Sequence, residues 1–93
     1  MTGEPDPPPP NLAVALEYEH GRDHAPRVTA SGRGAIAEKI VETARAHGVA
    51  VEGNPLLAEA LAGVAVDEEI PEDLYRAVAE VSGFVLRTAG KLR

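Results

Sequence analysis

One apolar segment near the start of the chain, Leu12–Tyr18, most constrains what this protein can fold into. Its sequence, LAVALEY, follows four consecutive prolines, Pro7–Pro10, which hold the backbone extended and cannot enter a helix interior. A polar run begins at Glu19, so the apolar stretch is short. These boundaries are typical of a buried β-strand. We therefore predict a sheet with this segment as its first strand.

The residues before this strand predict a leader ahead of one domain. Residues 1–11 are acidic and rich in proline, and they contain no apolar run of the kind that a signal peptide needs. Consecutive prolines favour an exposed polyproline II conformation. We expect residues 1–11 to be a disordered leader and residues 12–93 to form a single domain, as the length of 93 residues favours. A proline-rich ligand for a partner is the alternative.

Two further short segments predict strands. Arg27–Ala30 contains Val28 and Thr29, whose branched side chains favour a pleated sheet. Val49–Glu52 alternates between apolar and other side chains, which is also typical of a strand. A helix between these two segments would make them a parallel crossover, right-handed by default.

The segment from 35 to 47 has the pattern of that helix. Ser31 is expected to cap its start, because a serine hydroxyl can accept a bond from a free backbone N–H there. His47 lies in the predicted last turn, and Gly48 suits the residue that follows a helix end. The apolar residues recur at the three- and four-residue spacing of one helical stripe: Ile36, Ala37, Ile40, Val41 and Ala44.

Two more helices are expected in the second half of the chain. The first covers Leu56–Val64, and the second begins near Pro71, a residue favoured in a first helical turn. The apolar stripe of the last helix is Leu74, Val78, Val81 and Val85. The predicted order is therefore β–β–α–β–α–α. The fold class is α/β, with a small mixed β-sheet packed against about three helices.

Composition excludes several classes of function. The net charge is −6, which argues against nucleic acid and against an anionic membrane surface. The chain has no cysteine, so it can form neither disulfides nor a thiolate metal site. No apolar run approaches the roughly 20 residues that span a bilayer, so we expect no direct membrane insertion.

The residues with chemical potential do not form a recognisable active site. His20 and His24 lie four apart in a predicted loop, short of the three or four ligands of a metal site. Gly32-x-Gly34 lacks the further residues of a phosphate-binding loop. We therefore expect no catalytic, cofactor-binding or metal-binding residues. One acidic run has three interpretations: a carboxylate active site, a docking surface for basic partners, or a solvated patch at a helix start. Its residues are Asp67, Glu68, Glu69, Glu72 and Asp73.

Five segments together carry a resemblance that no single one of them carries. In chain order they are AVALEY (13–18), APRV (25–28), GRG (32–34), GVAVEGNPLLAEAL (48–61) and IPEDLYRAVAEV (70–81). In this order they resemble the cytoplasmic C-terminal domain of the FlhB/YscU family of type III export switch proteins. The resemblance covers about residues 12–87 and implies the fold of that domain.

The same resemblance places the family's self-cleavage motif, Asn-Pro-Thr-His, on Pro8–Asn11. In the family the asparagine attacks its own backbone carbonyl, and the chain breaks before the proline. Here Pro8 stands at the position of the asparagine and has no nucleophile, and Asn11 stands at the position of the histidine. We expect no self-cleavage by this route, and none at Asn54-Pro55, where the resemblance implies an ordinary strand-to-helix turn. The chain resembles the fragment that cleavage leaves.

The function that the resemblance implies is a non-enzymatic interaction module of the type III export apparatus, acting in substrate docking or export-specificity switching. The flagellar system is favoured, and the injectisome system remains open. Its expected partners are membrane components of the apparatus and export substrates, in the cytoplasm or at the inner membrane through a protein partner. The expected contact surfaces are the edge of the Asn11–Tyr18 strand and the segment Gly53–Leu61. The candidate partner-binding residues are Asn11, Leu12, Tyr18, Asn54, Pro55, Leu56 and Leu57. An adaptor outside secretion and a small self-cleaving protein remain the alternatives.

Overall fold

The computed structural model describes residues 10–17, 25–78 and 84–88. In chain order these ranges contain the following elements: β1 (Leu12–Glu17), β2 (Arg27–Arg33), α1 (Ala35–Ala46), β3 (Ala50–Gly53), α2 (Pro55–Leu61), α3 (Glu72–Val78) and β4 (Phe84–Thr88). The predicted strands at Leu12 and Arg27, the helix after Gly34 and the strand near Ala50 are all present.

The four strands form one mixed sheet in the order β2–β1–β4–β3. β1 pairs antiparallel with β2 and with β4, whereas β3 pairs parallel with β4. The register between β1 and β2 shifts between Ala15 and Leu16, as at a β-bulge. The predicted fold class, a small mixed sheet with three helices, is therefore confirmed.

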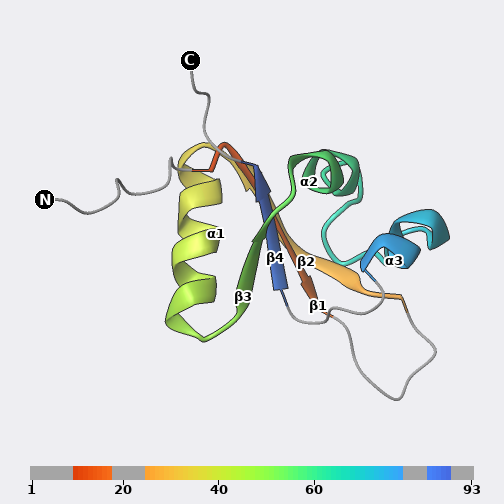
Figure 1. Ribbon diagram of the computed structural model, residues 1–93, viewed down its shortest axis with the longest axis horizontal. Helices are drawn as coiled ribbons and strands as arrows, with labels where there is room; N and C mark the ends of the chain where they lie inside the picture. The colour runs from red at the N-terminus through yellow and green to blue at the C-terminus, as the bar shows by residue number, and fades with distance from the viewer. Residues whose placement is uncertain (1–9, 18–24, 79–83, 89–93) are drawn as a thin grey trace, which may run out of the picture.

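The helices cover the two faces of the sheet unequally (Figure 1). α1 lies on one face, and α2 and α3 lie on the other. β1 supplies side chains to both layers, because successive residues of a strand point to opposite faces. Leu12, Val14 and Leu16 belong to the core cluster with α2 and α3, whereas Ala13 belongs to the cluster with α1.

The two core clusters are built from aliphatic side chains. The larger contains Leu12, Val14, Leu16, Val28, Ala58, Leu61, Ile70 and Val78. The smaller, under α1, contains Ala13, Ala37, Val41, Ala44 and Val85. Small residues on both α1 and the sheet let the helix approach the strands closely. The predicted α1 stripe is thus buried at Ala37, Val41 and Ala44, whereas Ile36 is 60% exposed.

The ends of α1 confirm one prediction and correct another. His47 is the C-cap residue, and Gly48 follows it with a positive φ of 74°, as predicted. Ser31 is not the N-cap: it lies within β2, where it pairs with Val14. Gly34 occupies the N-cap with a φ of 64°, a conformation that favours glycine, so β2 continues three residues beyond the predicted strand.

The end of the chain differs most from the prediction. Val85 was expected on the third helix, but it lies in β4, an inner strand between β1 and β3. The spacing of Val78 and Val85 also fits a helix, so the pattern favoured both structures. Pairing on both sides decides the outcome, because β4 supplies the ladder that joins β3 to β1.

The position of β4 corrects two further expectations. β1 lies between β2 and β4, so it offers no free edge, contrary to the expected edge surface at Asn11–Tyr18. The strands that flank α1 do not pair with each other, because β2 and β3 lie at opposite edges of the sheet. The parallel pair is β3 with β4, and α2 and α3 form its connection.

The boundaries of α2 and α3 are shorter than predicted. α2 begins at Pro55 and ends at Leu61, with Ala62 as its C-cap, so it stops before Val64. α3 begins at Glu72, directly after Pro71, whose carbonyl accepts a hydrogen bond from the N–H of Tyr75 at 2.8 Å. The predicted continuation of this helix over Val81 lies outside the described residues.

Candidate partner-docking surface

The junction of β3 and α2 is fixed by its own hydrogen bonds. The side-chain Oδ1 of Asn54 accepts a bond from the N–H of Leu57 at 3.1 Å, which makes Asn54 the N-cap of α2. The N–H of Asn54 donates to the carbonyl of Arg87 on β4, also at 3.1 Å. Pro55 opens the helix with a φ suited to that position. The expected strand-to-helix turn at Asn54-Pro55 is therefore confirmed.

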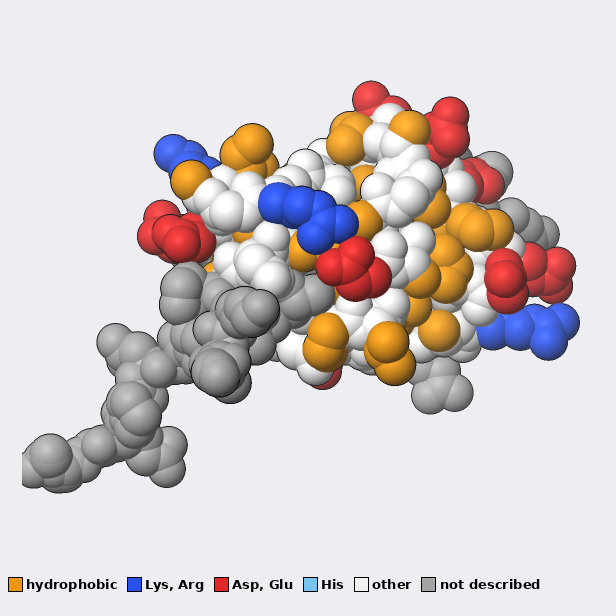
Figure 2. Space-filling model, turned by 90° about the horizontal axis from the view of Figure 1, so that it is seen from above, with side chains coloured by type: hydrophobic (Ala, Val, Ile, Leu, Met, Phe, Trp, Pro, Cys, Tyr) orange, Lys and Arg blue, Asp and Glu red, His pale blue; other side chains and the backbone are white. Residues whose placement is uncertain are grey.

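This rigid junction presents one leucine to solvent. Leu56 is 85% exposed, the largest exposed fraction among the described large hydrophobic residues. Its neighbour Leu57 is half-buried and packs against the larger core cluster. Figure 2 shows that hydrophobic side chains reach the surface among charged ones. We name residues 50–57 the β3–α2 corner.

The sheet register brings Asn11 to the same end of the molecule as this corner. Leu12 pairs with Thr88, and Gly53 pairs with Arg87, so the start of β1 and the end of β3 flank the end of β4. Two strand spacings amount to about 10 Å. Asn11 is exposed, and its carbonyl accepts a bond from the N–H of Gly34 at 3.2 Å.

Two other predicted contact residues have different outcomes. Leu12 is 1% exposed and packs within the larger core cluster, so the prediction that it contacts a partner is wrong for the folded domain. A strand residue whose side chain faces the covered side of a sheet is a core residue, even at the beginning of its strand. Tyr18 lies outside the described residues.

An ion pair joins the end of β2 to α2 near the corner. The guanidinium of Arg33 donates two hydrogen bonds to the carboxylate of Glu59, at 3.1 and 3.3 Å. These bonds and the opposite charge lower the pKa of Glu59 and raise the pKa of Arg33. Both side chains are more than half exposed, so the pair contributes little to stability. The pair links α2 to the end of β2, at the same end of the sheet as the corner.

Arg87 lies at the same end of the molecule as the corner, and the sequence alone did not indicate it as a candidate contact residue. Its Nε is buried and has no hydrogen-bond partner within the described part of the chain. A buried donor without an acceptor is costly, by roughly 1–3 kcal/mol. The sequence carries no signal for it, because the position becomes half-buried only through the placement of β4.

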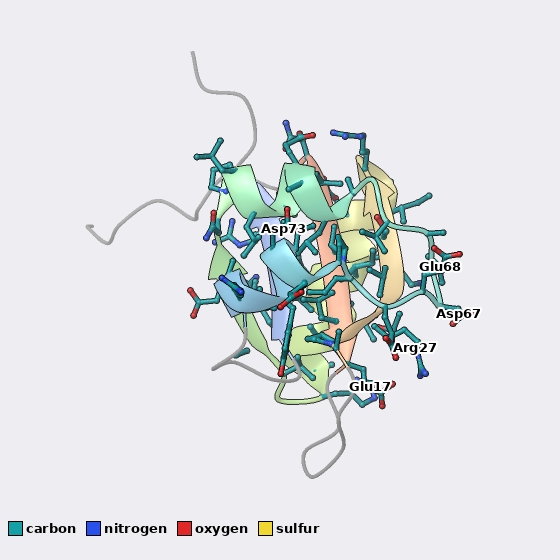
Figure 3. All side chains as sticks on the ribbon, turned by 90° about the vertical axis from the view of Figure 1, so that its right-hand side faces the viewer. Glu17, Arg27, Asp67, Glu68 and Asp73 are labelled. Atoms are coloured by element: carbon teal, nitrogen blue, oxygen red, sulfur yellow. The ribbon has the colours of Figure 1, made fainter. Side chains whose placement is uncertain are left out.

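The two edges of the sheet differ in how much backbone they leave free. Along β2, the segment after α2 adds bonds: Asp67 donates to Val28 at 2.7 Å, and Val28 donates to Glu68 at 3.0 Å. Figure 3 shows Asp67 and Glu68 on this loop beside Arg27, with Asp73 separate on α3. Among the described residues β3 pairs with β4 alone, so its outer edge is open.

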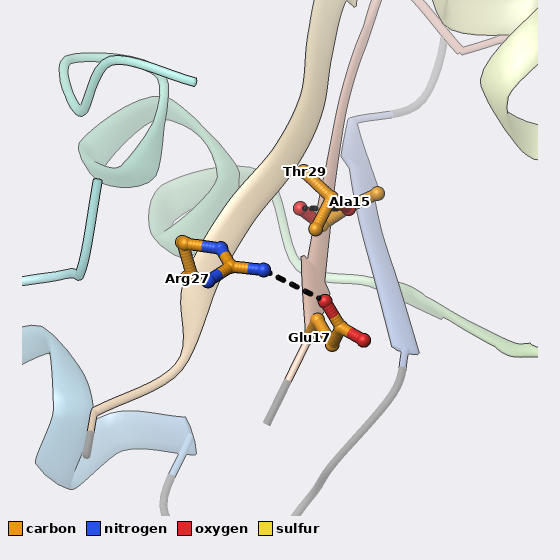
Figure 4. Close-up of polar contacts among 4 residues, drawn as sticks. All are labelled: Ala15, Glu17, Arg27 and Thr29. Atoms are coloured by element: carbon orange, nitrogen blue, oxygen red, sulfur yellow. Dashed lines mark hydrogen bonds and ion pairs between the residues drawn. The ribbon is translucent and has the colours of Figure 1, made fainter. Parts of the chain in front are cut away.

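The other chemical candidates do not converge. The acidic run is divided between the β2 loop and α3, where Glu72 pairs with Arg76 at 3.6 Å. At the far end of β2, Arg27 pairs with Glu17 at 3.1 Å, and the Thr29 hydroxyl donates to the carbonyl of Ala15 (Figure 4). Over the ranges described, no three potential metal ligands cluster together. His20 and His24 lie outside those ranges.

Comparison with known proteins identifies the class to which this fold belongs. The model of the FlhB HrpN YscU SpaS family matches residues 8–85. Among solved structures, the C-terminal domain of PscU has a TM-score of 0.70 and 35% identity, over 78% of this chain and 94% of that one. The C-terminal domain of EscU carrying H265A also has a TM-score of 0.70, with 28% identity over 78% and 89% of the two chains.

Two relatives differ in how much of their length is matched. Uncharacterized protein YlqH of Bacillus subtilis is 40% identical over 79 residues, which are 85% of each chain. Flagellar biosynthetic protein FlhB of Aquifex aeolicus is 44% identical over 79 residues, 84% of this chain but 23% of FlhB. This chain therefore spans about a quarter of that FlhB.

The chain belongs to the FlhB HrpN YscU SpaS family, and it has the fold of the C-terminal domain of the export switch proteins. The resemblance inferred from the five sequence segments is thereby confirmed. Members of the family belong to the type III protein export apparatus. The flagellar export apparatus is one form of it. No helix of the described residues has the length and hydropathy needed to cross a membrane.

Proposed function

We propose that this chain is a non-enzymatic interaction module of the type III export apparatus and that it docks through the β3–α2 corner. The chain acts in the cytoplasm, and a membrane component of the apparatus holds it at the inner membrane. Its role there is to dock substrates or to set which class of substrate is exported. The observation that carries the proposal is Leu56, 85% exposed on a junction whose backbone is held by Asn54.

A rigid, exposed leucine is suited to binding because its position costs little entropy to fix. Residues that dominate an interface lie in well-packed pockets from which water is excluded, and burying a leucine side chain in such a pocket is favourable by about 1.5–3 kcal/mol. Here the capping bonds of Asn54 and the packing of Leu57 order the backbone before any partner arrives. The side chain of Leu56 can therefore be buried without first folding a loop.

The open edge of β3 supports the same surface. An extended partner segment can add to a free strand edge through backbone hydrogen bonds. β3 offers this edge within the corner itself, whereas β1 is an inner strand and part of β2 is covered by the Asp67 loop. We therefore place the site of strand addition on the edge of β3, and not on the edge of β1 that the sequence led us to expect.

The alternative of a self-cleaving protein has a direct test. The side chain of Asn54 is engaged as a helix cap, which favours an intact Asn54-Pro55 bond. Intact-mass measurement after prolonged incubation at neutral pH is expected to return one unbroken chain. A fragment that begins at Pro55, or a break within residues 8–11, would overturn the non-enzymatic assignment.

Docking itself is tested by co-purification. The bait is a membrane-embedded export switch protein that ends directly after its own cleavage site, and the prey is this chain. We expect the wild-type chain to co-purify, Leu56→Asp to lose at least about tenfold of its binding, and Val66→Asp to bind normally. Val66 is a matched control, since it is also an exposed hydrophobic residue, at 48%, but lies away from the corner. Equal binding of all three chains would contradict the docking surface.

A further inference from the structure

A long apolar groove lies on the α1 face of the sheet, opposite α2 and α3. It has a volume of about 800 Å³ and runs along α1 from Ala35 to His47. Its floor includes Ala15 of β1 and Ala30 of β2, and its wall includes Ile36 and Ile40 of α1. The groove is separate from the β3–α2 corner, so its assignment is independent of the function proposed above.

The groove arises from the unequal layers of the fold. Four strands about 4.8 Å apart span roughly 14 Å between the outer strands, whereas one helix is about 10 Å across. Two helices cover one face of this sheet, but α1 alone covers the other. Ala13 and Val85 are fully buried beneath α1, whereas Ala15, at the margin of the same cluster, and Ala30 are only partly buried, so α1 covers this part of the face incompletely.

The shape and chemistry of the floor favour a helix as the occupant. Ala15 and Ala30 are opposite each other in the register and have small side chains, which permit a close approach. The floor is the face of the sheet and not its edge, so it offers no backbone partners to an extended segment. A helix satisfies its own backbone groups, and buried backbone groups must be satisfied. The 12 residues of α1 give a wall about 18 Å long, or about three helical turns.

The described helices of a second copy do not fit this role. α2 has seven residues, which is shorter than the groove, and Val78 of α3 is buried in the core of its own chain. α1 uses its apolar stripe against its own sheet, and its remaining surface carries exposed charges, including Glu38, Glu42 and Arg45. These features of the described helices favour a helix of another protein as the occupant.

The rim of the groove indicates one feature of that helix. Glu17 is paired with Arg27, and a ring nitrogen of His47 is bonded to the carbonyl of Thr43. Lys39 lines the groove, and over the described ranges it has no ion pair or hydrogen bond. An acidic side chain on the incoming helix would complement its ammonium group.

We propose that this groove binds an amphipathic helix of about three turns from a partner protein, with apolar residues at three- and four-residue spacing and a carboxylate opposite Lys39. The helix lies over β1 and β2 beside α1 and completes the second layer of the sheet. Its apolar face contacts Ala15, Ala30, Ile36 and Ile40.

The test is a selection from a fully randomised library of 14-residue peptides displayed on phage, with the full chain immobilised. We expect enriched peptides to share the helical apolar spacing and an acidic residue. Fluorescence anisotropy is then expected to show at least about tenfold weaker binding to Ile36→Glu. Because Ile36 is 60% exposed, this variant keeps the fold, which circular dichroism checks. Val66→Asp serves as the matched control and binds the peptides normally, because Val66 is also an exposed hydrophobic residue but does not line the groove.

A charge exchange tests the predicted pairing. Lys39→Glu should weaken binding about threefold, the size of an exposed ion pair, and a peptide with Lys in place of its acidic residue should recover the loss. Enriched peptides without helical spacing, or equal binding by Ile36→Glu, would overturn the proposal. A dimer of the wild-type chain that sedimentation detects and that Ile36→Glu dissociates would also overturn it. So would binding of dodecanoic acid in the groove when no helical peptide binds there.

Discussion

The close contact between Gly32 and Ile36 explains how β2 passes into α1. Gly32 lies against Ile36, the residue that forms the wall of the groove, and a Cβ at position 32 would lie 2.8 Å from the Cβ of Ile36. That approach is too close for any other residue type, because the clash involves an atom fixed to the backbone. The entry to the helix thus depends on the missing side chain at Gly32 and on the positive φ at Gly34.

Gly32→Ala is expected to destabilise the domain by roughly 1–3 kcal/mol through overpacking. Gly53→Ala is the matched control: a Cβ there meets nothing within 4 Å, and Gly53 also lies at the end of a strand. Urea denaturation of both variants measures the difference. Equal stability of the two variants would show that Ile36 moves aside freely.

The Arg33–Glu59 pair makes a prediction about pH. Hydrogen bonds from Arg33 lower the pKa of Glu59 from its ordinary value of 4.5. A carboxyl whose pKa is lowered by folding stabilises the folded state above its unfolded pKa, and this contribution disappears as the pH falls through the folded pKa. Carbon-13 NMR titration should therefore give a lower pKa for Glu59 in the wild-type chain than in Arg33→Met. The same pKa in both chains would mean that the pair does not persist in solution.

At the level of elements, α2 carries two leucines with different roles, one buried in the core and one exposed to solvent. Leu61 is fully buried in the larger core cluster, whereas Leu56 is 85% exposed. Leu61→Ala should cost about 2–5 kcal/mol in the free energy of unfolding. Leu56→Ala should change it by no more than about 0.5 kcal/mol. Thermal unfolding compares the two, and a large loss in Leu56→Ala would mean that Leu56 supports the fold.

β4 is the element on which the sheet depends most. A chain that ends at residue 83 loses the strand between β1 and β3, so we expect it not to fold. A chain that ends at Thr88 retains β4 and is the control. Far-ultraviolet circular dichroism and amide proton dispersion distinguish them. A folded chain ending at residue 83 would show that β3 and β1 are held together without β4.

The elements also show what the sequence could and could not predict. The run from Leu12, the α1 stripe and the Asn54-Pro55 turn each have a local pattern, and each is found where it was predicted, except that Ile36 of the stripe is exposed. β4 was missed because Val85 continues a helical spacing, while its strand pairing depends on residues about 35 and 70 positions away. The exposed Leu56 was selected, but Arg87 was not, since its burial follows from β4.

At the scale of the whole molecule, a small mixed sheet of the export switch family presents an exposed Leu56 at the β3–α2 corner, the surface that we propose for docking. The buried Nε of Arg87 lies at the same end of the sheet as that corner. Because the donor has no acceptor there, Arg87→Met should leave the stability unchanged or raise it by about 1 kcal/mol. Urea denaturation checks this. A clear loss of stability would show that Arg87 has a structural partner.

The most direct test of the central claim is secretion in a cell whose own export switch protein ends directly after its cleavage site. This chain is supplied in trans, and the secretion of early and late export substrates is measured. We predict that the wild-type chain restores secretion, that Leu56→Asp does not, and that Val66→Asp behaves as the wild type. Absence of rescue by a folded and abundant wild-type chain, in the cell of its own species, would contradict a role in export. Full rescue by Leu56→Asp would contradict the corner as its docking surface.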